Sequence, residues 1–250
     1  INLFDATGSR WTLLQNNTNG VFVALKSALE TWLHKVDAQM PRYCAIRFSS
    51  ENLYLSQHET IQKAIDKAKP GDIIKICPGV HEETLSIGKK VTLQSIDPEN
   101  QDIVESTILM AQYRESTRTL KSLINLRGNS NGVLIHGITL AGGNATRQDA
   151  NCRGIYVSSF TSTSSSMIRN CIVRNFRATQ SGAGISNFDG SIVHCVIKEN
   201  RTAKNGGAIY NCDGQLLHCI IVQNEAANGA GIYIHNGNPN IVNCTIVNNR

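Results

Sequence analysis

Residues 194–200 read HCVIKEN, and close variants of this segment recur as NCIVRN at 170–175, HCIIVQN at 218–224 and NCTIVNN at 243–249. The four cysteines are 24, 24 and 25 residues apart: Cys171, Cys195, Cys219 and Cys244. Glycine-rich segments keep the same spacing, with GAGI at 182–185, GGAI at 206–209 and GAGI at 229–232. Internal repetition with a period of about 20–50 residues indicates a solenoid.

The residue types within each repeat indicate which solenoid forms. Each repeat holds short runs of Ile and Val separated by Gly, Asn or Asp, and none holds a run with helical periodicity. Ile, Val and Thr favour strands, whereas Asn and Gly favour tight bends. Three short strands and three bends make one turn of a parallel β-helix, with successive coils about 4.8 Å apart. The pattern therefore predicts an all-β solenoid in which equivalent residues stack into ladders.

Two segments carry a resemblance to known proteins. Residues 60–95, TIQKAIDKAKPGDIIKICPGVHEETLSIGKKVTLQS, resemble the entry of the right-handed parallel β-helix, or pectin-lyase-like, superfamily. Residues 228–249, NGAGIYIHNGNPNIVNCTIVNN, are similar to the coils of surface β-helix proteins. The PGVHEE segment is also similar to pectinesterase openings and to the β-helix modules of certain F-box proteins. The resemblance covers residues 54–250 and implies a right-handed parallel β-helix.

The chain is expected to have two parts. Residues 1–53 are predicted to form a helical region that caps the β-helix, because residues 20–36 place apolar side chains on one helical face. Residues 54–250 are predicted to form the β-helix, opening with a capping helix at about 59–69 whose capping box is Ser56 and Glu59. No equivalent cap follows the last coil. There we expect an exposed edge, a partner that covers it, or a longer natural chain.

Composition limits the classes of partner. The 250 residues carry 24 Lys and Arg against 19 Asp and Glu, a net charge of +5 without a dense basic cluster in the sequence, so we expect no nucleic-acid partner. No apolar run is long enough to span a membrane. The partner we expect is a protein or a glycan.

The cysteines are interpreted as structural. The eight cysteines form no CxxC pair, which disfavours a zinc site, and we expect no metal. Stacked residues lie at the coil spacing rather than at disulfide distance, so the periodic cysteines are predicted to be buried free thiols. Cys212 lies off this column and is predicted to be the more exposed thiol. Free thiols favour a reducing intracellular compartment, with a cell-surface or extracellular location as the alternative.

Two columns of polar residues are the candidate sites. Asp189 and Asp213 occupy equivalent turns, where stacked carboxylates could act as a catalytic pair or hold Ca²⁺; otherwise no cofactor is expected. Asn187 and Asn211 precede them and are candidate binding residues. Asp-Gly is also a favoured turn sequence in its own right.

Histidines form the second column. His194 and His218 directly precede two of the periodic cysteines and are candidate binding residues pointing outward, or simply part of a solvent-facing polar stripe. His136 lies in NGVLIHGITLAGGN, which offers it no acidic neighbour.

Regular repetition without a converging set of titratable groups favours a non-catalytic β-helix that presents a rigid ladder surface to a protein or glycan. The aligned Asp and Arg set of pectate lyases, the paired Asp of polygalacturonases and the Gln and Asp motifs of pectinesterases do not appear. The alternative is a polysaccharide lyase or hydrolase of the pectin-lyase-like superfamily that uses Asp189 and Asp213. A further alternative is the substrate-recognition module of an intracellular F-box-type protein.

Overall fold

The computed structural model describes residues 60–111, 121–143, 152–158, 161–235 and 237–250, together with the backbone of three short strands, β1 (Asn2–Phe4), β2 (Arg10–Thr12) and β3 (Ala45–Phe48). The chain divides into two units, Ile1–Met40 and Pro41–Arg250. In the first unit, β1 and β2 pair antiparallel. The helix predicted within residues 20–36 lies outside the described residues.

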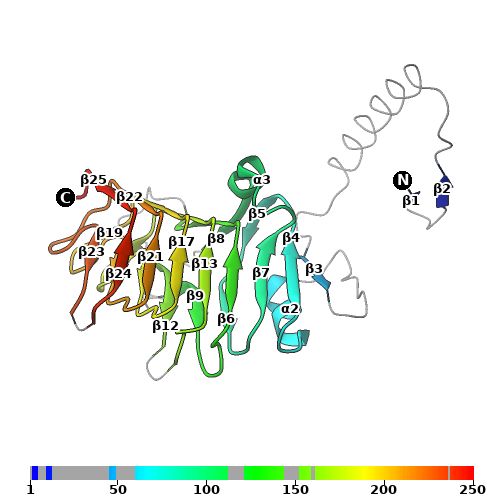
Figure 1. The fold of residues 1–250 in the computed structure, drawn as a ribbon, viewed down its shortest axis with the longest axis horizontal. Helices are drawn as coiled ribbons and strands as arrows, with labels where there is room; N and C mark the ends of the chain where they lie inside the picture. The colour runs from blue at the N-terminus through cyan, green and yellow to red at the C-terminus, as the bar shows by residue number, and fades with distance from the viewer. Residues whose placement is uncertain are drawn as a thin grey trace, which may run out of the picture. The chain divides into compact units, whose positions relative to one another are not determined.

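Three β-sheets run along the second unit (Figure 1). Sheet I consists of β4 (Ile73–Ile76), β7 (Thr92–Ser95), β10 (Leu134–His136), β13 (Met167–Arg169), β17 (Ser191–Val193), β21 (Gln215–Leu217) and β24 (Asn240–Val242), with β3 antiparallel at its edge. Sheet II consists of β5 (Gly79–Glu82), β8 (Thr107–Met110), β11 (Thr139–Ala141), β14 (Ile172–Arg174), β18 (Val196–Lys198), β22 (Ile220–Val222) and β25 (Thr245–Val247). Sheet III consists of β6 (Leu85–Ile87), β9 (Lys121–Leu126), β12 (Cys152–Val157), β15 (Arg177–Ala178), β16 (Ile185–Ser186), β19 (Arg201–Thr202), β20 (Ile209–Tyr210) and β23 (Ile232–Tyr233).

Each coil passes through sheets I, II and III in turn and then begins the next coil. Strands of successive coils pair in parallel, so that Ile192 lies beside Ile168 on one coil and Leu216 on the other. This arrangement confirms the predicted right-handed parallel β-helix. The coil numbers used below start with coil 1 at β4 and end with coil 7 at β24 and β25.

Helix α2 (Ile61–Lys67) precedes the first coil and buries an apolar face of Ile61, Ala64 and Ile65. Its N-cap is Thr60, whose side chain accepts a hydrogen bond from the Lys63 N–H, so the predicted cap at Ser56 was wrong. Glu83 explains the difference. Its carboxylate accepts the N–H groups of Ile61 and Gln62 at 2.9 and 3.1 Å and so satisfies donors that a helix start leaves unpaired.

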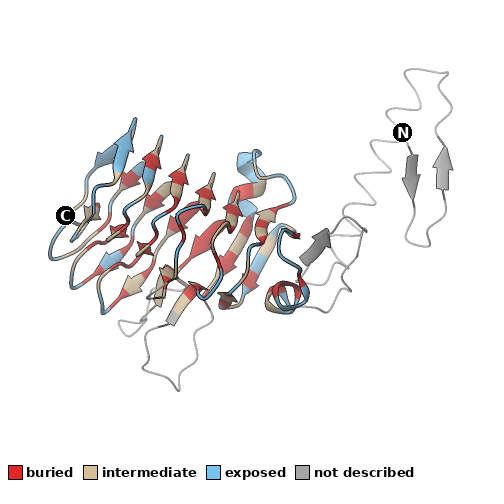
Figure 2. Ribbon diagram, turned by 60° about the horizontal axis from the view of Figure 1, so that its bottom comes forward, coloured by how far each residue is buried: buried red, intermediate tan, exposed pale blue. Residues whose placement is uncertain are grey.

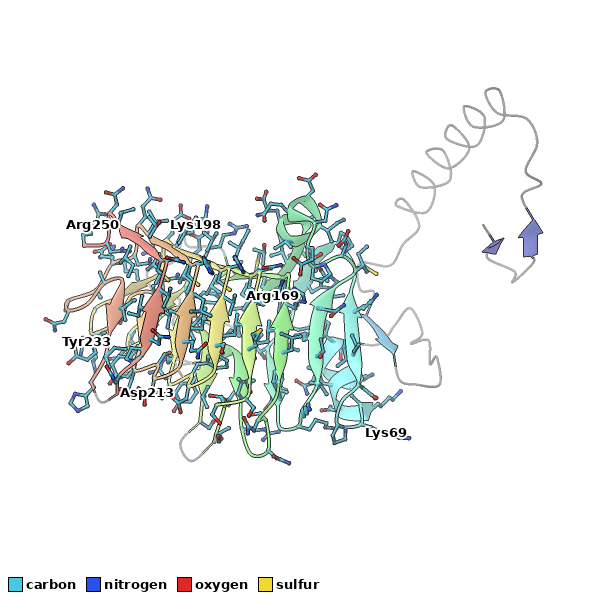
Figure 3. The ribbon with its side chains drawn as sticks, in the orientation of Figure 1. Lys69, Arg169, Lys198, Asp213, Tyr233 and Arg250 are labelled. Carbon is cyan, nitrogen blue, oxygen red and sulfur yellow. The ribbon has the colours of Figure 1, made fainter. Side chains whose placement is uncertain are left out.

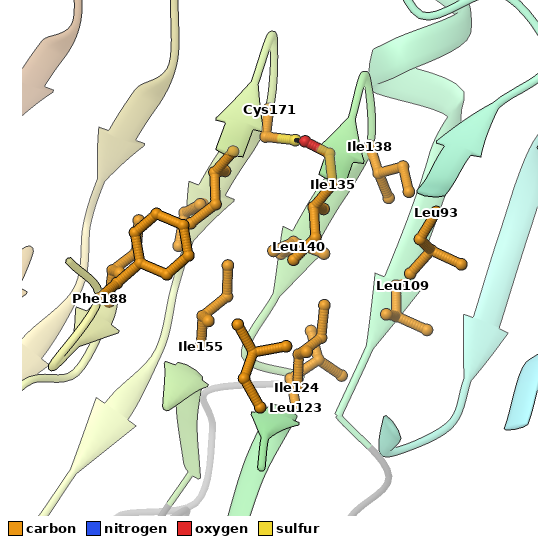
Figure 4. Packing of buried hydrophobic residues seen from close by; sticks show 14 of the residues in the cluster. Leu93, Leu109, Leu123, Ile124, Ile135, Ile138, Leu140, Ile155, Cys171 and Phe188 are labelled. Carbon is orange, nitrogen blue, oxygen red and sulfur yellow. Dashed lines mark hydrogen bonds between the residues drawn. The ribbon is translucent and has the colours of Figure 1, made fainter. Parts of the chain in front are cut away.

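Apolar side chains fill the space between the sheets (Figures 2 and 4). Strands such as β10 and β17 alternate between half-buried and fully buried residues, as expected when one face of each sheet lines the core. Of the four periodic cysteines, Cys171, Cys195 and Cys219 are buried free thiols, as predicted, whereas Cys244 on the last coil is a free thiol that is only partly buried. Each of the three buried thiols donates to a carbonyl of the preceding coil, at Ile135, Ile168 and Ile192 respectively, over 3.4–3.6 Å.

Cys212 is buried as well, so its predicted exposure was wrong. Its side chain points into the core, where Sγ accepts the Phe188 N–H at 3.3 Å, and burial raises the pKa of the thiol to about 12.

The tight bends place non-glycine residues in the left-handed region. Between sheets I and II these are Asn170, His194, His218 and Asn243, with φ of 50 to 54°. Between sheets II and III they are Asn175, Glu199, Gln223 and Asn248, with φ of 54 to 61°. Beside the second row, Asn200, Asn224 and Asn249 stack inward, and the side-chain oxygen of each accepts the N–H of the equivalent residue one coil earlier. Their amide groups donate to backbone carbonyls. These side chains thus have hydrogen-bond partners of their own and supply partners to the backbone groups of the bend, which offsets the cost of burying them.

Candidate functional site

One row of residues runs along sheet III from coil to coil; its members are half-buried except Ser186, which is fully buried and donates to the Gly182 carbonyl. The strand register places six residues in line from coil 1 to coil 6: Ser86, Asn125, Tyr156, Ser186, Tyr210 and Tyr233. The rings of Tyr210 and Tyr233 lie parallel, 5.7 Å apart between centroids and 7° from coplanar. We call this row the tyrosine column.

The glycine-rich repeats keep the backbone close to this column. Gly206 and Gly229 have φ of 71° and 57°, and a Cβ on either would lie 2.7–2.8 Å from the Cβ of Tyr210 or Tyr233. At Gly182, φ is 78° and a Cβ would lie 2.1 Å from the Ser186 Oγ. Only glycine combines this backbone conformation with the space that the column needs. The repeated GAG and GGA segments therefore support the tyrosine column as well as forming bends.

A hollow of about 450 Å³ lies at the other end of the same face. It is lined by Thr84, Leu85, Ser86, Ser122, Asn125, Arg153 and Tyr156. The Arg153 guanidinium lies 4.8 Å from the centre of the Tyr156 ring, within the range of a cation–π contact. Its Nε is buried and has no hydrogen-bond partner among the described residues, and burial lowers the pKa of Arg153, against the effect of Tyr156. The hollow thus combines hydroxyl and amide groups with one guanidinium N–H that no described residue pairs.

Asp189 and Asp213 occupy equivalent bends between sheets III and I. Burial raises the pKa of Asp189; the hydrogen bond from the Asp213 backbone opposes this rise, and the Asp213 charge adds to it. The side chains at this bend connect successive coils: Thr163 Oγ1 accepts the Asp189 N–H at 2.9 Å, and Asp213 Oδ1 accepts the Asn238 N–H. The two aspartates are therefore neighbours that also accept backbone hydrogen bonds along the axis.

Asn187 and Asn211 directly follow Ser186 and Tyr210 and begin this same bend, with φ of 58° and 50°. They adjoin the tyrosine column on its bend side. The aspartates and these asparagines thus lie on the same bend of the coil.

His194 and His218 lie at a different corner, between sheets I and II. Both are exposed, and their rings stack 4.9 Å apart and 6° from coplanar. The residues proposed from the sequence as binding groups therefore belong to two separate corners of the coil.

His136 does have an acidic neighbour, contrary to the expectation from its local sequence. Glu99 lies just before α3 (Gln101–Ser106), and its Oε1 is 3.1 Å from His136 Nε2 and 3.3 Å from an Arg169 nitrogen. Its other oxygen accepts from the Asn170 amide at 2.7 Å, the largest of the effects that lower the pKa of Glu99. Burial lowers the pKa of His136. Thirty-seven residues separate Glu99 from His136, so no local pattern could reveal the pair.

Sequence reasoning missed Arg153, Tyr156, Tyr210 and Tyr233. The repeats GGAIY and GAGIY do place Tyr210 and Tyr233 at equivalent positions, which was a usable signal. Tyr156 was hidden because the Ser- and Thr-rich stretch after it lengthens the repeat.

Among the described residues, no group of three or more His, Cys, Asp and Glu side chains could hold a metal ion. In the same part of the chain, neither helix has the length and apolar character that crossing a membrane requires.

No protein-family model matches the chain, and a search of curated proteins finds no match. Among solved structures, two pectin methylesterase structures from Aspergillus niger are similar. One, in penultimately deglycosylated form, is 15% identical with a TM-score of 0.53, covering 78% of this chain and 64% of that enzyme. The deglycosylated form is 16% identical with a TM-score of 0.48, covering 72% and 56%. The likeness to the first enzyme shows a parallel β-helix fold, and this chain spans about 64% of the length of that enzyme.

Proposed function

We propose that this protein recognises a polysaccharide, which lies along sheet III over the tyrosine column and the adjoining hollow. The observation that carries the proposal is the stacked Tyr210 and Tyr233 pair on the same face as the hollow with Arg153 and Tyr156. Because the two rings face each other, they offer their edges and hydroxyl groups rather than their faces, and a phenolic hydroxyl can hydrogen-bond the hydroxyl rim of a sugar ring.

The geometry favours an extended ligand. Equivalent side chains lie one coil, about 4.8 Å, apart, so Tyr210 and Tyr233 offer similar contacts at successive steps. The parallel sheets and the ladders inside them hold the surface rigid, and a preorganised site loses little entropy when it binds. A flexible polymer with repeating units matches such a surface better than a compact ligand does.

The hollow supplies the polar contacts that orient one sugar unit. Ser86, Ser122 and Asn125 offer hydroxyl and amide groups. The unpaired Arg153 Nε is a donor suited to a hydroxyl or a carboxylate oxygen, and a charge-assisted bond to a carboxylate is the stronger of the two. Sugar acids such as those of pectin are therefore the first ligands to test.

The likeness in fold to pectin methylesterase favours a second candidate, a polysaccharide-modifying enzyme. In that case Asp189 and Asp213 are the carboxylates available beside the tyrosine column. Their backbone hydrogen bonds support the simpler interpretation, in which they stabilise the bend.

Binding is tested by calorimetry with polygalacturonate, methyl-esterified pectin and a neutral β-glucan. Loss of binding in Tyr210→Ala/Tyr233→Ala and in Arg153→Ala, with retention in His194→Ala/His218→Ala, is the expected result. Equal affinity in all variants would overturn the proposal. Methanol release and unsaturated-product absorbance, measured with the wild type and Asp189→Asn/Asp213→Asn, test the enzyme candidate. Turnover lost only in the double Asn variant would support that candidate.

A further inference from the structure

Four cationic side chains stack at the bend between sheets II and III on two neighbouring coils. Arg174 on β14 lies directly beside Lys198 on β18. Two residues beyond the bend, Arg177 on β15 lies directly beside Arg201 on β19. We call these four residues the basic ridge; Lys198 is labelled in Figure 3.

The other coils show that the fold does not need charge at these positions. The residues equivalent to Arg174 and Lys198 are Ala141 in coil 3, Val222 in coil 6 and Val247 in coil 7. The residue paired with Arg201 on the next coil is Glu225. Charge of one sign is therefore concentrated on coils 4 and 5.

Stacking like charges on adjacent strands is unfavourable, and the protein relieves it only in part. Glu225 pairs with Arg201 at 3.3 Å and lies 3.9 Å from Arg250. The Asn175 amide joins Glu199, at 2.9 Å, to Arg174, at 3.2 Å. Within the described part of the chain, Arg177 and Lys198 form no ion pair or hydrogen bond through their side chains.

We propose that the basic ridge is a binding site for a polyanionic glycan, which carries sulfate or carboxylate groups and runs along the solenoid axis. Anions bound between the stacked cations would reduce the repulsion between them. The repulsion in the free protein therefore favours binding of an anionic ligand. Cations at the coil spacing of about 4.8 Å present closely spaced partners for successive charged groups of one chain. This site is separate from the hollow on sheet III, and the inference does not depend on the function proposed above.

A glycan fits the ridge better than a single-stranded nucleic acid does. Proteins that hold single strands combine cations with aromatic side chains on which bases stack. The aromatic residue at this bend, Phe176, lies fully inside the core. The ridge therefore offers charge without a stacking platform.

The test measures the affinity of the intact chain for heparin, polygalacturonate and a single-stranded DNA oligonucleotide over a series of salt concentrations. Arg174→Gln/Lys198→Gln is the ridge variant. Lys63→Gln/Lys69→Gln, with exposed lysines at and just beyond α2, is the control that loses the same charge. We expect at least one of the two glycans to bind. The ridge variant should then bind about tenfold more weakly, with a slope of log affinity against log salt smaller by about 2.

No binding to either glycan, or equal losses in the control, would overturn the proposal. Tighter binding of the DNA oligonucleotide than of either glycan would overturn the class of ligand. Tyr210→Ala/Tyr233→Ala should keep the affinity for heparin, even where it loses affinity for polygalacturonate, and a loss of heparin binding in that variant would show that sheet III carries the binding. Thermal unfolding provides a second check: the ridge variant should be as stable as the wild type or slightly more stable, because repulsion is removed. A clear loss of stability would show instead that the cations are structural.

Discussion

Replacing Asn224 with alanine should destabilise the protein strongly, because this side chain is fully buried and connects three coils. Its Oδ1 accepts both the backbone N–H and the side-chain amide of Asn200, each at 3.0 Å. Its own amide donates to the Ile197 carbonyl at 3.0 Å and to Asn249 Oδ1 at 2.9 Å. In the alanine variant the Asn200 N–H and the Ile197 carbonyl lose these partners in the interior.

The expected magnitude follows from the Asn200 N–H, which is left without a partner, and from the one hydrogen bond lost at the Ile197 carbonyl. A buried polar group left without a partner costs about 1–3 kcal/mol and a lost hydrogen bond about 0.5–1.5 kcal/mol, so the change costs about 1.5–4.5 kcal/mol. A domain is typically stable by about 5–15 kcal/mol, so this loss is a large share of the total. Asn249, at the partly exposed last coil, holds the equivalent position with fewer neighbours, and Asn249→Ala should cost less.

Urea unfolding followed by circular dichroism measures the effect. Gln215→Ala is the control, since its exposed side chain on sheet I should change the free energy of unfolding by less than about 0.5 kcal/mol. If the free energy of unfolding of Asn224→Ala lies within about 1 kcal/mol of that of the control, then the stacked Asn200, Asn224 and Asn249, the asparagine ladder, do not stabilise the coils.

Three more outcomes follow from particular residues. Gly206→Ala should lower stability by about 1–3 kcal/mol by thermal unfolding, because φ is 71° and the new Cβ would meet Ile209 and Tyr210; an unchanged midpoint would contradict the role given to the repeated glycines. Cys212, with a pKa raised to about 12, should resist alkylation at pH 8 in the folded protein and react once it is unfolded, as judged by peptide mass mapping; rapid labelling without unfolding would show that the thiol is accessible. The pKa of Asp189 is raised in the folded protein, so folding favours the protonated carboxyl group. Any stability that this group contributes is therefore lost as pH rises through that pKa. Asp189→Asn should therefore raise the melting temperature slightly at pH 7, by the equivalent of under about 0.5 kcal/mol, and the gain should vanish in acid; a larger gain in acid would reverse the sign of the argument.

The fold was predictable because its information is local and repeated. Cys171, Cys195 and Cys219 recur at a fixed spacing, and parallel stacking converts sequence spacing directly into spatial neighbours. The Asp189 and Asp213 neighbours could be predicted for the same reason. Interactions between residues that are not related by the repeat could not be predicted. Glu99 reaches His136 from an inserted turn, and Glu83 caps α2 from beyond the first strand of the β-helix.

The same limit applied to the candidate site. Cys212 is turned inward by a bend whose direction the residue types do not specify. The repeat that ends at Tyr210 and Tyr233 was visible, but the lengthened coil before it concealed Tyr156 and Arg153. The basic ridge became visible only when the coils were aligned in space, because Arg174 and Lys198 are isolated charges along the chain.

The asparagine ladder also determines how this protein can change in length. Each position of the ladder, or rung, is hydrogen-bonded to the residue 24 or 25 positions further along. The length of the repeat therefore determines which residues pair. Excision or duplication of one whole coil would leave every remaining rung facing an equivalent group, whereas a deletion of part of a coil that removes a rung would leave the rungs on either side of it without a partner. The protein is thus built to tolerate gene rearrangements in units of a coil, and a longer or shorter binding face could arise in a single genetic step.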